Sequence, residues 1–560
     1  MNAMSVEERL ETARAWLRQD PDAETRDELA GLITRAASGD AAAVADLDDR
    51  FGTRLAFGTA GLRGALGAGS NRMNRVLVSQ AAAGFAAYLL ERSGGQTPTV
   101  VVGYDGRRNS RRFAQDSAEL FAGAGLRAIL LPRLLPTPVL AFAVRHLGAD
   151  AGVMVTASHN PPNDNGYKVY LGGAEEGSQI VSPADAEIAA HIQRTADAGD
   201  IAALPRSSGY EVAGEDIVDA YVAATAAVAP APESARGLTW VYTAMHGVGW
   251  ETLARILDAA GYPRPKTVFE QLNPDPTFRT VAFPNPEEPG AMDLAFAAGR
   301  RTRADFILAN DPDADRLAVA IPDESAEGGW RRLSGNEIGL LLGARAARAA
   351  EGTAGASLAC SLVSSPGLGV IAAHHGLDFH ETLTGFKWIS RAPGMVFGYE
   401  EALGYLVNPE TVRDKDGISA AIAVLGLAAE ARERDETLAS LLADLGEAYG
   451  HFASGQVSVR VDDLSIIGKV MLALRTLPPT RIGAVAVESV EDLLQAGAGQ
   501  PSGDVLRYRL ADGSRVIVRP SGTEPKLKVY LDAQASSAAD ATGVVAALED
   551  GVRALLEERS

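Results

Sequence analysis

The sequence is nearly free of cysteine: Cys360 is the only one among 560 residues. No disulfide can therefore form within the chain, which favours a reducing compartment, and we expect a cytoplasmic protein. We also expect no secretory signal. The opening residues, MNAMSVEERLETARAW, carry acidic side chains early and contain no apolar core segment.

Long apolar runs and an excess of basic charge are also missing. The charge-free stretch from Gly417 to Ala429 is too short to span a membrane and is typical of a buried or amphipathic helix. The chain has 52 Lys and Arg against 72 Asp and Glu, a net charge of −20. Nonspecific nucleic-acid binding requires clustered basic residues, so we expect neither a nucleic-acid nor a membrane partner. A small phosphorylated substrate stays possible, because it needs only a local basic pocket.

The order of strand-like and helix-like segments predicts the fold class. A helical segment covers about residues 5–50, and strands and helices then alternate in three rounds. Such alternation predicts α/β domains with parallel or mixed sheets covered by helices. After Gly450 the chain is mostly strands, with helices near 464–475 and 537–558, which predicts a C-terminal α+β domain. Clusters of Gly, Ser and charge place the boundaries. We predict domains at 1–208, 209–322, 323–450 and 451–560.

Three aspartates alternate in NDPDADRLAV, directly after an apolar strand: Asp311, Asp313 and Asp315. If this backbone is extended, their side chains point the same way and repel unless a cation lies between them. Hard oxygen ligands favour Mg²⁺ or Ca²⁺. An EF-hand loop would need Gly and Glu where Arg316 and Pro322 stand, so we exclude it. The alternative is a solvated acidic turn. We favour a metal site, which in turn suggests phosphoryl chemistry.

The segment VIVRPSGTEPKLKVY resembles a phosphate-binding loop. Arg519 offers a planar fork for phosphate oxygens, and Ser521, Gly522 and Thr523 offer hydroxyl and backbone N–H donors, with Lys526 close behind. Pro-Ser-Gly is also an ordinary turn sequence, so a plain hairpin stays open at this point.

Two weaker signals accompany these motifs. FGTAGLRG is a glycine-rich segment whose informative residue is Arg63, although glycines alone also suit a flexible connection. GYEEALG carries paired acids, Glu400 and Glu401, which could accept hydrogen bonds from sugar hydroxyls or form a solvated turn.

The segment VTASHNPPNDNGYKVY places Ser158, His159 and Lys168 after a strand. It does not fit the hydrolase pattern G-x-S-x-G, and a free serine is a weak nucleophile. The ordinary role of such a serine is to cap a surface turn. Next to an aspartate metal site a second interpretation arises, in which Ser158 carries a phosphate that the metal binds.

Together the four motifs resemble the α-D-phosphohexomutase superfamily. The segments TASHNPPNDNGYK, DPDADR, GYEEALG and RPSGTEPK occur in that family's order and span about residues 50–530. FGTAGLRG, YTAMHGVG and FPNPEEPGAMDLA are similar to its phosphoglucomutase-2 and phosphopentomutase-like branch. The resemblance implies three related α/β domains and a C-terminal α+β domain around a central cleft.

The resemblance also implies a reaction and its residues. Ser158 matches the phosphorylated serine, and its phosphate completes a Mg²⁺ shell formed by Asp311, Asp313 and Asp315. Arg63 and Lys168 match positions that assist phosphoryl transfer, with Lys168 as acid or base and His159 close by. A sugar 1,6-bisphosphate is the implied intermediate and activator.

Substrate contacts follow from the same resemblance. The sugar contacts match Glu400, Thr384 and Gly385. The site for the non-reacting phosphate matches Arg519, Ser521, Gly522 and Thr523. The basic lining of the cleft also includes Lys526 and Arg316. The chain departs from the family at Ala402, where many members have serine, which weakens the case for strict hexose specificity.

We therefore predict a phosphoglucomutase acting as a monomer or homodimer on glucose 1-phosphate and glucose 6-phosphate. Phosphomannomutase and phosphopentomutase activity are alternatives with the same mechanism. A glucose 1,6-bisphosphate synthase, which is a transferase, is a further alternative. A metal-dependent phosphatase and a noncatalytic binding protein are less favoured, because the nucleophile, metal and phosphate motifs are all present and no water-activating residue is evident.

Overall fold

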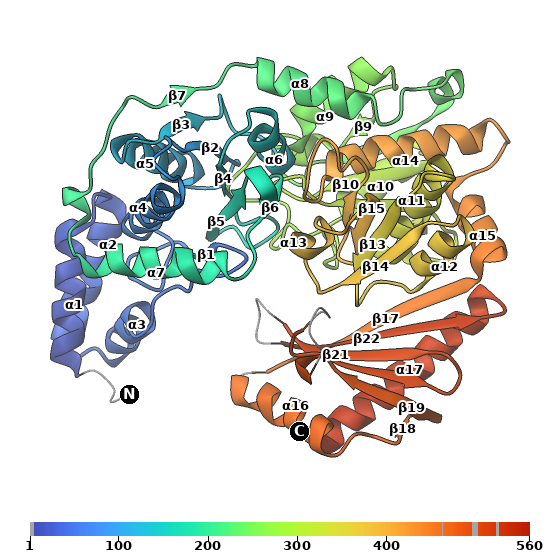
Figure 1. Ribbon diagram of the computed structural model, residues 1–560. Coiled ribbons are helices and arrows are strands. Elements are labelled where there is room, and N and C mark those ends of the chain that lie inside the picture. The colour runs from blue at the N-terminus through green and yellow to red at the C-terminus, as the bar shows by residue number, and fades with distance from the viewer. Residues whose placement is uncertain (1–4, 462, 496–501, 522–525, 560) are drawn as a thin grey trace. The chain divides into compact units, whose positions relative to one another are not determined.

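The computed structural model describes residues 5–461, 463–495, 502–521 and 526–559 (Figure 1). The chain forms two compact units, each composed of two stretches of sequence. The first contains Met1–Arg332 and Asn408–Ala429, and the second contains Leu333–Val407 and Glu430–Ser560. Among the residues described, no helix has the length and apolarity needed to cross a membrane.

The first unit begins with a bundle of three short helices. Each starts at a side chain that caps its free backbone N–H groups, namely Ser5, Asp22 or Asp40. The buried face of the bundle includes Trp16 and Phe51, whose rings meet edge to face. The helices are α1 Val6–Gln19, α2 Ala23–Ala37 and α3 Ala41–Phe51.

A mixed sheet follows, with strand order β1-β5-β4-β2-β3-β7 and β6 beside β5. Strands β4, β2, β3 and β7 run parallel, whereas β5 is antiparallel to β1, β4 and β6. The strands are β1 Leu62–Ala65, β2 Thr99–Tyr104, β3 Arg127–Leu130, β4 Ala151–Val155, β5 Asp164–Leu171, β6 Ser178–Gln179 and β7 Glu211–Val212. The helices are α4 Arg75–Arg92, α5 Ser110–Gly123, α6 Thr137–His146 and α7 Ala184–Asp197.

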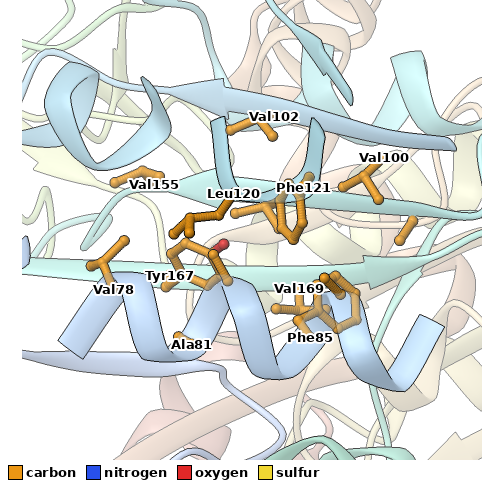
Figure 2. Packing of buried hydrophobic residues seen from close by; sticks show 14 of the residues in the cluster. Val78, Ala81, Phe85, Val100, Val102, Leu120, Phe121, Val155, Tyr167 and Val169 are labelled. Carbon is orange, nitrogen blue, oxygen red and sulfur yellow. The ribbon is translucent and has the colours of Figure 1, made fainter. Parts of the chain in front are cut away.

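The core of this sheet explains how β5 is held. Figure 2 shows Phe85 of α4 beside Val169 of β5, and Tyr167 of β5 between the sheet and the helix. Tyr167 is fully buried, and its hydroxyl donates to Ser117 Oγ at 3.1 Å. Burying Tyr167 and Val169 on one face of β5 fixes its register, so Lys168 between them lies on the opposite face.

The second sheet of this unit has the order β12-β11-β10-β8-β9. Strands β10, β8 and β9 run parallel, and β11 and β12 add antiparallel strands. The stretch Asn408–Ala429, which carries most of α14, also packs in this unit. The strands are β8 Trp240–Thr243, β9 Lys266–Thr267, β10 Phe306–Asn310, β11 Leu317–Pro322 and β12 Trp330–Arg332. The helices are α8 Asp216–Ala226, α9 Gly249–Ala260, α10 Asp293–Thr302 and α14 Gly417–Arg432.

The second unit contains a third mixed sheet and a fully antiparallel one. The third has the order β14-β13-β15-β16, with β14, β13 and β15 parallel. Its strands are β13 Ser357–Ser361, β14 Asp378–Thr382, β15 Met395–Glu400 and β16 Gly404–Leu406. Its helices are α11 Gly335–Ala350, α12 Gly367–His374, α13 Phe386–Ile389 and α15 Leu438–Tyr449.

The antiparallel sheet has the order β17-β22-β21-β20-β19-β18. One of its faces packs against helices α16 and α17. The strands are β17 His451–Arg460, β18 Arg481–Ile482, β19 Val485–Asp492, β20 Leu506–Leu510, β21 Arg515–Pro520 and β22 Lys526–Ala535. The helices are α16 Leu464–Thr476 and α17 Ala538–Arg559. Three mixed sheets with helices, followed by an α+β domain, confirm the predicted fold class; the domain boundaries stay a prediction.

Candidate active site

Ser158 lies in a loop that begins where β4 ends. Its backbone is left-handed, with φ of 51°, and its N–H donates to Thr156 Oγ1 at 2.9 Å. Left-handed backbone is unfavourable for serine, so tertiary contacts must hold it there. The side chain is 2% exposed and its Oγ donates to Asp311 Oδ2 at 2.8 Å. The serine and the first aspartate of the triad therefore meet, although 153 residues separate them.

The three aspartates converge through a turn after β10, which corrects the expectation of an extended backbone. Ala314 has φ of 57°, and its N–H donates to Asp311 O at 2.9 Å, so the chain reverses between the acids. All three carboxylates are fully buried, and each offers an oxygen within 4.8 Å of the others. Thr137, at the start of α6, supports the turn by donating to Asp313 Oδ2 at 2.6 Å.

Two buried lysines meet this turn. Lys168 on β5 lies 2.7 Å from Asp313 Oδ2 and 2.8 Å from Asp315 Oδ2. Lys415 Nζ lies 3.0 Å from Asp315 Oδ2. Lys415 was not predicted from the sequence as a site residue. The available signal was a lysine between two aspartates in RDKDG, just before an apolar helix. Burial alone would lower the pKa of the Lys168 ammonium, but Asp313 and Asp315 raise it above its ordinary value.

The geometry fits a divalent cation. In the part of the chain that the structure describes, Asp313 Oδ1 and Asp315 Oδ1 are buried and accept no hydrogen bond. The lysines bind the other oxygen of each of these two carboxylates, so the two Oδ1 atoms are the ones left for a metal; Arg316 Nε lies 3.9 Å from that of Asp315. Burial and the charges of Asp313 and Asp315 also raise the pKa of the Asp311 carboxyl well above its usual range. A hard cation such as Mg²⁺ would relieve this repulsion.

Arg63 reaches the serine loop from β1. The strand pairs with β5, and just before it Gly61, with φ of 74°, passes so close to Tyr167 that a Cβ would lie 1.8 Å from the Tyr167 carbonyl oxygen. Only glycine fits at this position. Arg63 Nη1 then donates to Asn160 Oδ1 at 3.2 Å. Burial lowers the pKa of the Arg63 guanidinium, an effect that the charge of Asp313 opposes.

His159 and Arg316 complete the group in the first unit. His159 Nδ1 lies 3.1 Å from Ser158 Oγ, and burial together with Arg316 and Arg63 lowers its pKa well below the usual value. The backbone N–H of Arg316 donates to Asp311 Oδ1 at 3.0 Å. Every site residue predicted in this unit therefore lies at or beside the aspartate turn.

Arg107 is a second residue that sequence reasoning missed. It follows β2, is 4% exposed, and donates four hydrogen bonds to backbone carbonyls of the serine loop. Nη2 reaches Ser158 O at 2.6 Å and Asn160 O at 2.5 Å, and Nη1 reaches Pro161 O at 2.8 Å and Asp164 O at 3.1 Å. Since only a guanidinium has a fork able to make all four contacts, Arg107 fixes the shape of this loop.

We expect Arg107→Lys to loosen the serine loop. A lysine has three donors on one atom and cannot replace the fork, so at least one carbonyl loses a charge-assisted bond, at a cost of about 2–3 kcal/mol. Faster hydrogen exchange in residues 157–165, together with a lower urea midpoint, would show this. Arg108→Lys is the matched control, because Arg108 is exposed and pairs with Glu24. Equal loop exchange in the two variants would contradict the assignment.

In the second unit the paired acids have separate environments. Glu400 ends β15 and is half-buried. Glu401 points into the domain, where Ser361 Oγ donates to its Oε2 at 3.0 Å and its own N–H donates to Ser364 Oγ at 3.1 Å. Glu401 is thus held by serines, and the role of Glu400 as a sugar contact stays a prediction. Thr384 and Gly385 are half-buried between β14 and α13.

The predicted phosphate loop joins β21 to β22 in the same unit. Arg519 and Lys526 are half-buried on these strands, and Ser521 N donates to Lys526 O at 2.8 Å, which closes the loop. Gly522 and Thr523 lie outside the described residues. The phosphate-binding role of this segment stays a prediction.

Known protein families match this architecture. Four phosphoglucomutase/phosphomannomutase models match in order: alpha/beta/alpha domain I at residues 54–198, domain II at 219–325, domain III at 334–449 and the C-terminal domain at 478–550. A solved phosphoglucomutase/phosphomannomutase family protein from Burkholderia thailandensis shares the fold, with a TM-score of 0.67 and 21% identity over 90% of this chain and 98% of that one.

Relatives with mutase names cover nearly the whole chain. A Haemophilus influenzae protein named "Probable phosphomannomutase" is 54% identical over 87% of this chain and 98% of its own. Human phosphopentomutase is 35% identical over 93% and 90%. A Staphylococcus epidermidis phosphoglucomutase is 34% identical over 86% and 90%.

These matches define an intramolecular phosphotransferase, which is an isomerase. More specifically, the chain belongs to the phosphoglucomutase/phosphomannomutase family, as the sequence motifs predict. The first-unit site is consistent with this chemistry.

Proposed function

We propose that this protein moves phosphate reversibly between C1 and C6 of a hexose, interconverting glucose 1-phosphate and glucose 6-phosphate. The observation that carries the proposal is the contact between Ser158 Oγ and Asp311 Oδ2, at 2.8 Å, in a turn of three buried carboxylates. A serine in this position can carry a phosphoryl group next to a cation site and needs no hydrolase-type base.

In the transfer step, a free hydroxyl oxygen of the sugar monophosphate bonds to the phosphorus on Ser158. The bond between Ser158 Oγ and phosphorus breaks, and a sugar bisphosphate forms. The sugar hydroxyl loses its proton, and Ser158 Oγ regains one. His159 Nδ1 lies 3.1 Å from Ser158 Oγ, and Lys168 donates to Asp313 in the aspartate turn that Ser158 contacts. These two side chains are our candidates for carrying the protons. The reverse step on the other phosphate completes the isomerisation.

Positive side chains offset the charge that is spread over the transferring group. Arg63 lies at the serine loop, and Lys415 joins Lys168 at Asp315. When bound by Asp311, Asp313 and Asp315 with the Ser158 phosphate, Mg²⁺ would supply Lewis-acid stabilisation of the same charge. A sugar 1,6-bisphosphate would activate the enzyme by phosphorylating Ser158.

The second unit carries the residues to which the proposal assigns the sugar hydroxyls and the non-reacting phosphate. Glu400, with the backbone at Thr384 and Gly385, accepts hydrogen bonds from the sugar hydroxyls. The non-reacting phosphate binds at the loop after β21, through Arg519, Ser521, Gly522, Thr523 and Lys526. The bisphosphate turns by half a revolution between the two transfers, so the same residues hold both of its ends in succession.

Pentose phosphates are the second candidate substrate, because Ala402 replaces the serine common in hexose-specific members and because human phosphopentomutase is 35% identical. Mannose phosphates are a third, by similarity to the Haemophilus influenzae relative.

We expect glucose 1-phosphate to have the highest kcat/KM among glucose, mannose, ribose and deoxyribose 1-phosphates. Each is assayed with Mg²⁺ and the matching bisphosphate, and the products are identified by phosphorus NMR. A higher kcat/KM with ribose 1-phosphate would replace the hexose proposal by the pentose one. Net accumulation of bisphosphate from an external donor would instead identify a synthase.

A further inference from the structure

The predicted phosphate loop follows β21, and one face of this strand packs on the preceding α/β domain. On β21, Arg515, Ile517 and Arg519 alternate and therefore share a face. Ile517 pairs with Tyr530 of β22. Both form a buried cluster with Leu362 and Val363, which follow β13, and the partly buried Leu383 packs against it. The strand that carries the phosphate loop thus lies directly on the loop after β13.

Arg515 is the polar centre of this face and is 7% exposed. Its Nε lies 2.8 Å from Asp532 Oδ2 on the neighbouring strand, and its Nη1 lies 2.9 Å from Glu381 Oε1 on β14. Its Nη2 donates to the carbonyl oxygen of Ser364. Burial alone would lower the pKa of this guanidinium, but Asp532 and Glu381 raise it above its ordinary value. Arg515 is therefore a permanent cation with all three nitrogens engaged.

Ser364 connects Arg515 to the sugar loop, by which we mean the segment around Glu400 and Glu401. Its hydroxyl accepts from the Glu401 N–H at 3.1 Å and lies 3.4 Å from Glu401 Oε2. Ser361 binds the same carboxylate oxygen at 3.0 Å. Because Glu400 precedes Glu401 on the chain, the backbone that presents Glu400 is fixed by the residue that Arg515 holds.

Tyr530 makes a second link between the two loops. It is 4% exposed and is hydrogen-bonded to Arg519. Burial and the charge of Glu401 raise the pKa of its hydroxyl, with a further contribution from Glu400 and an opposing one from Arg519. The tyrosine hydroxyl thus lies within electrostatic reach of both loops, which supports a direct connection between them.

We propose that Arg515 is a positioning residue that sets the spacing between the phosphate loop at Arg519 and the sugar loop at Glu400. The inference rests on the proposed function, in which these loops hold one phosphate and the hydroxyls of the same sugar. A ring of given size needs one spacing, and a rigid three-way guanidinium contact maintains it better than separate hydrogen bonds do.

The chain offers a matched control. Arg507 on β20 also forms an ion pair with Glu381, and its other partner is Glu491. Arg507→Lys therefore disturbs the same carboxylate and the same sheet, and it leaves Ser364 and Glu401 untouched. A purely structural role for Arg515 predicts equal effects of Arg515→Lys and Arg507→Lys.

The experiment measures both variants with the preferred sugar monophosphate. For Arg515→Lys we expect KM to rise about tenfold while kcat changes less than about threefold, since spacing affects binding of ground and transition states alike. Arg507→Lys should leave KM within about twofold of the parent. A parallel measurement uses hydrogen exchange in residues 395–406. Inorganic phosphate should slow this exchange in the parent and in Arg507→Lys, and have no such effect in Arg515→Lys.

Ser364→Ala removes the hydroxyl that accepts from the Glu401 N–H, so it breaks the connection between Arg515 and the sugar loop at Glu401. This variant tests the proposal if Arg515→Lys does not fold. It should reproduce the rise in KM and the lost response to phosphate. The proposal is overturned if Arg515→Lys, or Ser364→Ala in its place, behaves like Arg507→Lys. If the parent turns over no sugar phosphate, the proposed function fails by itself, whereas the exchange response to phosphate still tests the connection.

Discussion

Ser158→Ala is expected to abolish mutase turnover, with kcat reduced by at least about 1,000-fold in a coupled assay. The alanine lacks the oxygen that lies 2.8 Å from Asp311 and that carries the phosphate in our proposal. The described hydroxyls nearby have other partners: Thr156 Oγ1 accepts from the Ser158 N–H, and Thr137 Oγ1 donates to Asp313. The folded structure should persist, since the loop is held by Arg107 through backbone carbonyls, which the substitution leaves intact.

Intact mass distinguishes this mechanism from a direct transfer. After incubation with glucose 1,6-bisphosphate, the parent protein should gain one phosphate and Ser158→Ala none. Ser93→Ala serves as the control, because Ser93 is a partly exposed residue at the end of α4. Activity above a few per cent of the parent in Ser158→Ala, or a phosphate retained on it, would refute the covalent mechanism.

Asp313→Asn is expected to weaken Mg²⁺ binding at least about tenfold and to lower kcat at least about 100-fold. The substitution keeps the size of the side chain and removes one anionic ligand. Asp313 Oδ1 is buried and, among the described residues, accepts no hydrogen bond, whereas Oδ2 accepts from Lys168 and Thr137. Burial would raise the pKa of this carboxyl, but Lys168 and Thr137 hold it below its usual range, so the parent presents a charged ligand.

Calorimetric titration with MgCl₂ measures the metal response without reference to activity. The increase in melting temperature on adding Mg²⁺ should shrink in parallel, because a ligand stabilises only the state that binds it. Asp323→Asn is the control: it makes the same charge change in a turn where Asp323 accepts from Ser325, away from the triad. An unchanged Mg²⁺ isotherm in Asp313→Asn would remove this residue from the ligand set, even if turnover were lost.

Much of the fold could be predicted from the local pattern of apolar and polar residues. The alternation of strands and helices predicted three mixed sheets followed by an α+β domain, because burial on one or both faces leaves its period in the sequence. The helical segment near residues 5–50 appears as α1, α2 and α3, with acidic or hydroxyl residues at each start. Capping depends on neighbours within three residues, so it can be seen without tertiary information.

Contacts between distant segments could not be inferred in this way. The aspartates lie in a turn with left-handed Ala314, whereas their alternating spacing predicts an extended backbone. Lys415 meets Asp315 because the stretch after β16 packs in the first unit, and Arg107 meets four carbonyls that lie more than 50 residues further along the chain. Neither residue belongs to a motif that its own neighbours define.

The sequence by itself determined the family, the enzyme class and the candidate nucleophile and aspartates, because each chemical motif is a short run whose spacing the backbone preserves. Only the tertiary structure decided which oxygens face a cation, which lysines balance them, and how Arg515 connects two loops. Those properties depend on burial and on side chains brought within about 3 Å across long loops, where a hydrogen bond or ion pair becomes strong. Such distances result from tertiary packing, which produces no repeating pattern of residues in the sequence.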